Sequence, residues 1–348
     1  MDVNGLKGLE RISQEIGKQP DLVQGGGGNT SAKLDDTYMA VKASGYRLDG
    51  VTQDDGYVIV DYQKIRDYFR NVDTNRDVDF EKESAGFMKQ CILEDKNPKN
   101  LRPSIETGFH SFMGKYVIHT HSVYANILCC AKEGEEIAQK IFKDGFSMLW
   151  VPYTNPGFEL TIELNKSIHR YIEDNGHSPN IIFMENHGAI VSGEEVEDCL
   201  ELHEKVNRAI SNHFILEAPY PSIRVERIGE NRHKSLTNYL SDVIREGNIG
   251  PDLFKDIILY PDQLVYLGDN ISFEGKGKVN IDKDSGEVIY STNEAEAITI
   301  DETFTAYIYV VEMVKKLELS IQTMSEDAIL FIKNMEGEKY RKSLLKDK

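Results

Sequence analysis

Apolar residues in the first part of the chain alternate between short β-branched runs and longer helical stripes. Residues 38–43 and 56–61 are rich in aromatic and β-branched side chains and are bounded by glycine or aspartate, which is typical of strands. Residues 116–122 and 181–184 have the same character, and the second of these runs resumes at 189–191 after a polar break. Because helix-like stretches separate the runs, the pattern predicts a layered α/β fold.

A helix is expected to open near Pro103 and Ser104. Apolar residues recur at helical spacing from there to Met113, which places Glu106 near the first turn. The Glu106 carboxylate could fold back toward the strand at 116–122, or it could simply be a helix N-terminal glutamate favoured by the helix dipole. The residues alone leave both interpretations open.

A long helix is expected to close the first unit. Ser192 followed by Glu195 has the pattern of a capping box, and an apolar stripe follows it. His203 lies on this stripe, so we expect a hydrogen-bonded core histidine rather than a metal ligand. The composition then changes at a pair of prolines, and the predicted division of the chain is 1–218 and 219–348.

The C-terminal extension is expected to be α+β. Residues 263–267 look strand-like, a hairpin is predicted to turn at 283–286, and a last helix has Ser325 as its N-cap. The apolar stripe from Ile329 to Met335 predicts that this helix packs on the body of the molecule or on a partner. We therefore expect the extension either to reshape the substrate mouth or to mediate assembly.

Charge and composition narrow the class of partner. The chain has 348 residues and a formal net charge of -18, which repels nucleic-acid phosphates and anionic membranes. No apolar run reaches the roughly 20 residues of a membrane helix, and residues 1–20 carry charges rather than an apolar signal core. Cys91, Cys129, Cys130 and Cys199 show neither CxxC spacing nor the density of a disulfide scaffold. We expect a cytoplasmic protein with reduced thiols and with no nucleic-acid or membrane partner.

Three histidines are the strongest candidates for chemistry. His119 and His121 alternate on a predicted strand, so both side chains point to one face, with Cβ atoms roughly 6 to 7 Å apart. Two imidazoles at that spacing can converge on one ion. His187, in Asn186-His187-Gly188, lies at the break between two strand-like runs and is the third candidate. Three neutral imidazoles with an open fourth position are typical of a catalytic zinc site. The other histidines are expected at the surface or on helix faces: His110, His169, His177, His203, His213 and His233.

A glycine-rich segment supplies candidate anion contacts. Residues 25–28 are consecutive glycines followed by Asn29, and they could wrap an anion with backbone amides or serve as a flexible linker. No Walker or dinucleotide-binding pattern is present. Ser44, Gly45 and Ser104 each add a hydroxyl or an amide next to a turn or a helix start. In an acidic chain, this set indicates that a phosphate would be recognised by backbone amides rather than by a basic patch.

The order of these motifs resembles the class II aldolase/adducin family, which includes fuculose-1-phosphate and rhamnulose-1-phosphate aldolases. The similarity spans roughly residues 5–215. The motifs, in family order, are Gly27-Gly28-Asn29-Thr30-Ser31, Ala43-Ser44-Gly45, Pro103-Ser104-Ile105-Glu106, Ile118-His119-Thr120-His121, Pro152-Tyr153 and Asn186-His187-Gly188. The glycine-rich form looks most similar to the aldolase half of bifunctional rhamnulose-phosphate aldolase/dehydrogenases.

The resemblance implies an α/β fold with a central, largely antiparallel sheet flanked by helices, and a homotetramer with active sites between subunits. It implies that Zn2+, or another divalent metal, is held by His119, His121 and His187, with Glu106 as the catalytic acid or base. The positions that match the family's phosphate-binding residues are Gly28, Asn29, Ser44, Gly45 and Ser104. The implied activity is that of a zinc-dependent lyase, an aldolase that cleaves or forms a carbon–carbon bond in a small phosphorylated ketose through an enediolate.

Two departures from the family pattern bear on the substrate. Ile105 stands where a fuculose-type enzyme has a second serine, and no tyrosine lies between Tyr124 and Tyr153, where some members place a tyrosine that reaches across the subunit boundary. A sugar-phosphate 4-epimerase is one alternative, although such enzymes usually carry aspartate at the position of Glu106. A non-catalytic adducin-like scaffold is another, although adducin-type members lose the metal ligands. A dehydratase acting on a thiosugar phosphate is the weakest.

Overall fold

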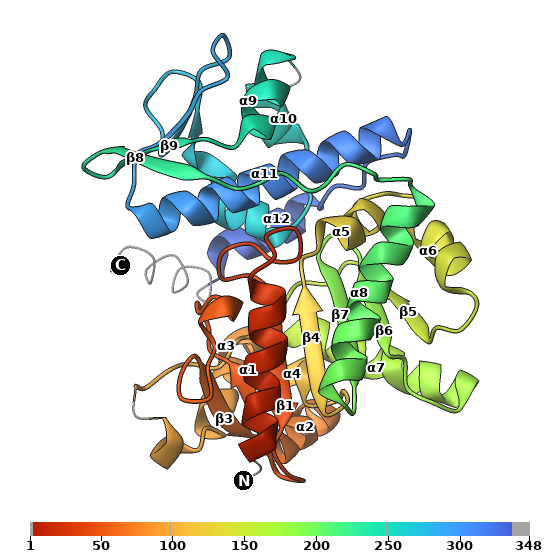
Figure 1. The fold of residues 1–348 in the computed structure, drawn as a ribbon. Helices are drawn as coiled ribbons and strands as arrows, with labels where there is room; N and C mark the ends of the chain where they lie inside the picture. Colours follow the sequence, from red (N-terminus) through yellow and green to blue (C-terminus); the bar gives the residue numbers. More distant parts are fainter. Residues whose placement is uncertain (1–2, 98, 248, 336–348) are drawn as a thin grey trace.

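A seven-stranded sheet organises the first part of the molecule in the computed structural model, which describes residues 3–97, 99–247 and 249–335 (Figure 1). The strand order is β3-β2-β1-β4-β7-β6-β5, and neighbouring strands are antiparallel apart from β5 and β6. The strands are β1 Asn29–Lys33, β2 Tyr38–Lys42, β3 Tyr57–Asp61, β4 Tyr116–Thr120, β5 Met148–Val151, β6 Ile181–Met184 and β7 Gly188–Gly193. This arrangement confirms the predicted α/β class with a largely antiparallel central sheet.

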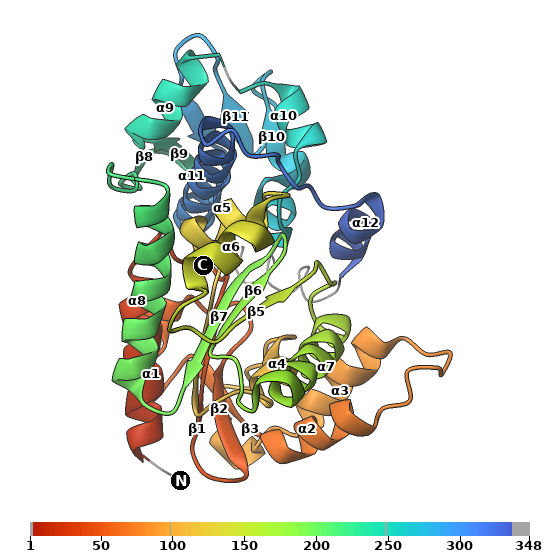
Figure 2. The same cartoon turned by 90° about the vertical axis from the view of Figure 1, so that its right-hand side faces the viewer.

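Helices cover both faces of this sheet (Figure 2). On one face lie α1 Val3–Gly17 and α8 Val196–His213, whose apolar side chains join the main core cluster. On the other lie α2 Tyr62–Asn71, α3 Phe80–Gln90, α4 Thr107–His110 and α7 Phe158–Asn175. Two short 3-10 helices, Leu48–Gly50 and Glu94–Lys96, lie in the connections, and α5 Val123–Cys129 and α6 Gly134–Phe142 follow β4. The sheet is therefore buried on both sides, which explains why its strands are mainly apolar, apart from β1 (Asn-Thr-Ser-Ala-Lys).

A second, five-stranded sheet and a long helix form the C-terminal unit, residues 219–335. The strand order is β10-β11-β12-β9-β8. Its elements are β8 Val225–Gly229, β9 Arg232–Ser235, α9 Asn238–Arg245, α10 Pro251–Asp256, the π-helix η3 Gln263–Leu267, the 3-10 helix Gly268–Asn270, β10 Ile271–Ser272, β11 Val279–Ile281, β12 Val288–Tyr290, α11 Glu294–Lys316 and α12 Glu326–Asn334. This content confirms the predicted α+β character of the extension.

Helix α11 joins the two parts of the molecule. It lies across the end of the first unit in Figure 1, between the second sheet and α5. Phe304 and Ile308 of α11 share one core cluster with Val123 and Ile127 of α5. Because these side chains are buried together, apolar contacts hold the C-terminal unit against the first unit, and the division at 218 stays a prediction.

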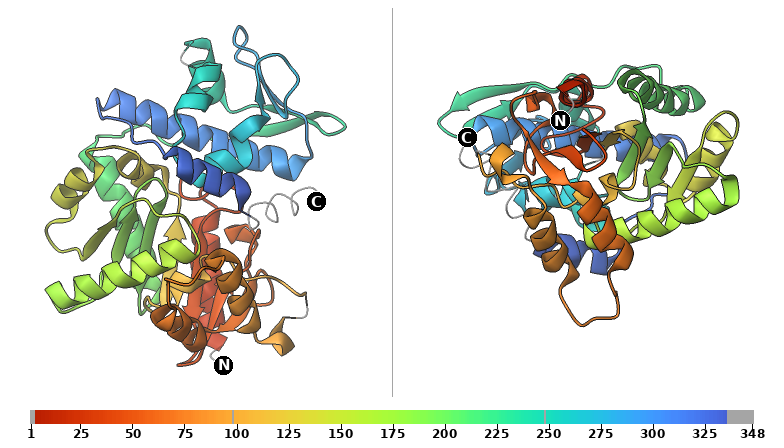
Figure 3. Two further views of the ribbon diagram at one scale, coloured as in Figure 1. Left: turned by 180° about the vertical axis from the view of Figure 1, so that it is seen from behind. Right: turned by 90° about the horizontal axis from the view of Figure 1, so that it is seen from below.

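The π-helix η3 and α12 pack together on the side of the C-terminal unit that faces the first sheet (Figure 3). Leu264 and Tyr266 of η3 form a cluster with Ala328 and Ile332 of α12, and Tyr153 of the first unit packs against it. The strand predicted at 263–267 is wrong. A short apolar run that is buried on all sides gives no period by which a strand can be told from a helical turn.

Two predicted helix starts are also wrong. Pro103 forms a β-bridge with Ala43, so the helix begins only at Thr107 and Glu106 is its N-cap residue. Ser192 pairs with β4 as part of β7, and Glu195 is the N-cap residue of α8. In both places, pairing with a neighbouring strand takes residues whose local pattern favoured a helix.

Other local predictions are confirmed. The hairpin of β11 and β12 turns where expected, with the Gly286 amide donating to the Asp282 carbonyl at 2.9 Å. The Ser325 hydroxyl accepts a hydrogen bond from the Ala328 amide, as an N-cap should. Cys91, Cys129, Cys130 and Cys199 are buried and free. Within the described ranges, every helix is too short or too polar to cross a lipid bilayer.

Candidate metal centre

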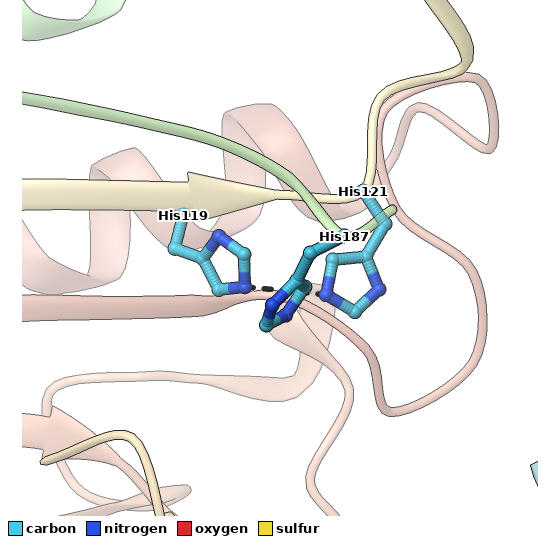
Figure 4. Close-up of side chains that lie close together, drawn as sticks. All are labelled: His119, His121 and His187. Atoms are coloured by element: carbon cyan, nitrogen blue, oxygen red, sulfur yellow. Dashed lines mark hydrogen bonds between the residues drawn. The ribbon is translucent and has the colours of Figure 1, made fainter. Parts of the chain in front are cut away.

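The three predicted histidines converge at one end of the central sheet. Figure 4 shows the rings pointing toward one another, with His119 from β4, His121 from the segment that follows, and His187 from the loop before β7. All three are buried, and one nitrogen from each ring lies within 4.8 Å of the other two. The Nε2 atoms of His119 and His121 are 3.2 Å apart. The structure thus brings together ligands that are 68 residues apart from His119 to His187 (187 minus 119).

Strand register and one glycine place these rings. His119 lies opposite Ile190 of β7 and opposite Asn29 of β1, so it projects from the middle of the sheet. The loop that carries His187 passes directly over the end of β4. A Cβ atom on Gly188 would lie 2.3 Å from the Thr120 carbonyl oxygen, so only glycine allows this close approach.

The ring nitrogens that face away from the centre have partners of their own. His119 Nδ1 lies 3.1 Å from the Ala189 carbonyl oxygen, and His121 Nδ1 lies 2.5 Å from Asp262 Oδ2. Such contacts fix the ring orientation and leave Nε2 as the ligand atom. Burial lowers the pKa of His187 to about 4, so this imidazole is neutral near pH 7, the form that binds metal.

Glu106 completes the group. Its Oε1 atom lies 3.2 Å from His187 Nε2 and 3.5 Å from His119 Nε2, and the residue is only 5% exposed. Burial acts to raise the pKa of Glu106, but the adjacent His119 and His187 rings outweigh it and hold this pKa well below its ordinary value. The carboxylate therefore folds back to the histidines, which favours the first of the two interpretations given for it.

This donor set fits a divalent ion. Imidazole nitrogen and carboxylate oxygen are the ligands that Zn2+ takes in catalytic sites. Two nitrogens bound to one tetrahedral zinc ion would lie roughly 3.4 Å apart, since each Zn–N bond is about 2.1 Å. The observed separation of 3.2 Å between His119 Nε2 and His121 Nε2 agrees with that spacing.

The glycine-rich loop is a buried, hydrogen-bonded segment rather than an exposed linker. The Gly25 amide donates to Glu302 Oε2 at 2.8 Å, and Lys42 Nζ donates to the Gly26 carbonyl oxygen at 3.1 Å. Gly28 has φ +64, and a Cβ atom there would lie 2.8 Å from the His119 carbonyl oxygen. Glycine is required at Gly28 because the loop turns tightly against β4.

The candidate phosphate contacts lie around this loop. The bridge between Ala43 and Pro103 brings the Ser44 turn beside Ser104, and the Gly45 carbonyl oxygen lies 3.6 Å from the Cβ position of Gly26. Asn29 Oδ1 accepts from the Thr30 amide, and Ser104 Oγ accepts from the Glu106 amide. The segments that carry Gly28, Asn29, Ser44, Gly45 and Ser104 thus meet beside the histidines, and their phosphate-binding role stays a prediction.

Two histidines outside the centre differ in how well they were predicted. His203 is buried in α8, and its Nε2 atom lies 2.9 Å from Thr120 Oγ1, which confirms a satisfied core histidine. The prediction for His233 is wrong, because this residue lies buried in β9 with Nδ1 3.0 Å from the Thr292 carbonyl oxygen.

His110 is in a helix as expected but is fully buried, with Nδ1 2.8 Å from Ser31 Oγ. Its ring stacks on that of Phe109, with the two centroids 4.7 Å apart. Burial lowers the pKa of His110 to about 3, so this imidazole is neutral near pH 7.

The sequence did not predict two residues of the C-terminal unit that contact His121 or the glycine-rich loop. Asp262 contacts His121, and Glu302 accepts from the Gly25 amide while it pairs with Arg47 through two hydrogen bonds of 2.8 Å. The one available signal for Asp262 was its position as the lone acidic residue in the apolar run 257–267. Glu302 gave no such signal in a helix rich in acidic residues.

Comparison with known proteins identifies the family to which the chain belongs. The family model for the Class II Aldolase and Adducin N-terminal domain matches residues 9–213. The Uncharacterized oxidoreductase YuxG of Bacillus subtilis (strain 168) is 30% identical over 259 residues, which is 69% of this chain and 35% of that protein, so the chain spans about a third of that relative's length. The N-terminal class II aldolase domain of a conserved protein from Thermoplasma acidophilum is 23% identical, covers 60% of this chain and 92% of its own, and has a TM-score of 0.50. The L-fuculose-1-phosphate aldolase from Thermus thermophilus is 13% identical over 61% of this chain and 97% of its own, with a TM-score of 0.38. With more than half of its length matched by the family model, the chain belongs to the class II aldolase/adducin family.

Proposed function

We propose that this protein is a zinc-dependent aldolase that cleaves or forms a carbon–carbon bond in a small phosphorylated ketose. The observation that carries the proposal is the Glu106 carboxylate, which lies 3.2 Å from His187 Nε2 and 3.5 Å from His119 Nε2 within a buried histidine cluster. We further propose that it acts as a cytoplasmic homotetramer.

The roles of the residues follow from their positions. His119, His121 and His187 would hold the ion, which when bound would polarise a substrate carbonyl and stabilise the negative charge that develops beside it. Glu106 is the group that moves a proton. In cleavage its ionised carboxylate would take the proton of the hydroxyl that becomes the aldehyde oxygen, and would pass it to the carbon next to the carbonyl after the C–C bond breaks. In synthesis the same proton would move in the opposite direction, from that carbon through Glu106 to the new hydroxyl.

The phosphate of the substrate would lie on the glycine-loop side of the centre. Gly28, Asn29, Ser44, Gly45 and Ser104 lie on three segments that meet there. Backbone amides and hydroxyls bind phosphate without a net positive charge, which suits a chain with a net charge of -18. Anchoring the phosphate would keep the reacting carbons in register with Glu106.

The retained chemistry argues against a scaffold role. A non-catalytic relative has no need for three buried imidazoles and a buried carboxylate, since burying such groups costs free energy unless they are paired. All four are present and in contact here.

A substrate screen tests the proposal. The purified chain, loaded with Zn2+, is incubated with a panel of ketose 1-phosphates, and the products are followed by proton NMR. We expect a three-carbon ketone phosphate and an aldehyde, with activity lost in His187→Ala and kept in His169→Ala, where the histidine is exposed on α7. No cleavage across the panel would contradict the proposal, and an epimerised sugar phosphate without free aldehyde would replace it by the epimerase alternative.

A further inference from the structure

Residues outside the family's common domain reach directly into the metal centre. The family match ends at residue 213, whereas Asp262 lies in the C-terminal unit, immediately before the π-helix η3. Asp262 is 2% exposed, and its Oδ2 atom lies 2.5 Å from His121 Nδ1. His121 directs its other nitrogen, Nε2, toward His119. The carboxylate and the ligand position are therefore on opposite sides of one imidazole ring.

The surroundings of Asp262 are built to hold this contact. The glycine-rich loop passes over the pair so closely that a Cβ atom on Gly27 would lie 2.6 Å from Asp262 Oδ2 and 3.0 Å from His121 Nδ1. The next residue, Gln263, accepts from the Leu259 amide at 2.7 Å and donates to the Ile257 carbonyl oxygen at 2.9 Å. These bonds fix the start of η3, so the Asp262 side chain is presented from a rigid element.

His121 needs such a partner more than the other ligands do. His119 belongs to β4 and is held by strand pairing on both sides, whereas β4 ends at Thr120 and leaves His121 beyond the ladder. A ring outside the regular sheet can rotate unless its second nitrogen is bonded. Asp262 supplies that bond.

A second connection ties the C-terminal unit to the loop of the third ligand. Asn186 precedes His187, and its Nδ2 atom donates to the carbonyl oxygens of Leu259 at 2.8 Å and Gln322 at 2.9 Å. Asn186 itself has a φ of +50 and is 1% exposed, so its backbone is held in an uncommon conformation by these bonds. Two of the three ligand segments are thus anchored on residues beyond 218.

We propose that the C-terminal unit is part of the metal centre and that Asp262 is a positioning residue, which orients His121 by accepting a hydrogen bond from its proton-bearing Nδ1 and leaves Nε2 to bind the ion. The proposal rests on the metal site of the proposed function but not on the aldol reaction. A carboxylate in this place strengthens the imidazole as a ligand and fixes its tautomer.

Metal affinity tests the role of Asp262. The dissociation constant for Zn2+ is measured by competition with a chromogenic chelator for the full chain and for Asp262→Ala, Asp262→Asn and Asp269→Ala, the last being a control at a residue whose side chain is 95% exposed. We expect Asp262→Ala to bind roughly 10- to 100-fold more weakly, Asp262→Asn to show a smaller loss because an amide oxygen can still accept, and Asp269→Ala to match the wild type. An Asp262→Ala chain that binds within about twofold of the wild type would overturn the proposal.

A second variant tests the same contact without removing a polar group. Gly27→Ala places a methyl group against the Asp262 carboxylate, whereas Gly50→Ala is its control because nothing lies within 4 Å of the Cβ position there. The visible spectrum of the Co2+-loaded protein reports the ligand geometry directly. We expect a changed spectrum and weaker binding for Gly27→Ala and Asp262→Ala but not for Gly50→Ala, with circular dichroism confirming that each chain is folded.

The outcomes separate this inference from the proposed function. A wild-type chain that binds no divalent ion would overturn the metal site and the role of Asp262 together. A chain that binds Zn2+ but cleaves no ketose phosphate would overturn only the aldolase proposal. Identical affinities and Co2+ spectra across the Asp262 and Gly27 variants would overturn only the role of Asp262.

Discussion

The family domain and the C-terminal unit contribute to one centre in different ways. In residues 9–213, the three histidines and Glu106 belong to short motifs whose residue types and spacing indicate a metal site. In the C-terminal unit, Asp262 contacts His121 across 141 residues of sequence and Glu302 contacts Gly25 of the glycine-rich loop across 277, and no motif surrounds either residue. Local sequence therefore supplies the reacting groups, whereas long-range packing supplies the groups that hold them in place.

The largest effect is expected from a substitution that removes catalytic activity in the family domain but leaves metal binding intact. Glu106→Gln removes the carboxylate that accepts and donates the proton, so kcat for ketose phosphate cleavage is expected to fall by about 100- to 10,000-fold. Metal content should be unchanged, because three imidazoles remain. Steady-state kinetics measures the loss, with Glu173→Gln as the control at an exposed position of α7. A kcat within tenfold of the wild type would rule out Glu106 as the acid or base.

The next effect concerns whether the C-terminal unit unfolds with the family domain. Ile332 of α12 is 2% exposed and packs on η3, whereas Leu330 on the same helix is 57% exposed. Ile332→Ala is expected to lower the free energy of unfolding by about 2 to 5 kcal/mol, and Leu330→Ala by no more than about 0.5 kcal/mol. Urea denaturation followed by circular dichroism measures both.

A single transition is expected in that experiment, because α11 and α5 share one core. Two separate transitions, with only one shifted by Ile332→Ala, would show that the C-terminal unit unfolds independently. That result would contradict the conclusion that its packing holds residues of the family domain in place.

A smaller effect is expected from His203 of α8, which contacts Thr120 of β4. Burial lowers the pKa of His203 to about 4, compared with about 6.5 in the unfolded chain. Because the folded state binds fewer protons, stability is fully present above about pH 6.5 and is lost as the pH falls toward 4. The difference amounts to roughly 3 kcal/mol at most.

His203→Gln, which cannot take a proton, should therefore lose less stability than the wild type between pH 6.5 and pH 4. Urea unfolding at four pH values across this window measures the two slopes. Equal slopes for the two proteins would show that His203 does not stay neutral in the folded state.

The sequence predicted the part of the site that depends on local pattern. The strand at 116–122 predicted that His119 and His121 lie on one side, and the break at Asn186-His187-Gly188 marked the third ligand. From the sequence alone, Glu106 could be either a carboxylate at the metal centre or a helix N-terminal glutamate. Its approach to His187 depends on the bridge between Ala43 and Pro103, which no local pattern predicts.

The rest depends on contacts that no local pattern records. The run 257–267 is apolar because the π-helix is buried on every side, so neither its helical form nor the direction of Asp262 follows from periodicity. The pairing of Ser192 with Val117 of β4 likewise determines that it lies in a strand and does not cap a helix. Tertiary packing overrides local preference in both places.

The content of bound metal shows whether the three histidines bind an ion. Purified wild-type protein, dialysed against Zn2+ and then against metal-free buffer, is analysed by inductively coupled plasma mass spectrometry beside His119→Ala and the exposed control His169→Ala. We expect one ion per chain in the wild type and in His169→Ala, and far less than one in His119→Ala. An equal ion content in all three proteins, or no ion in any of them, would contradict this expectation.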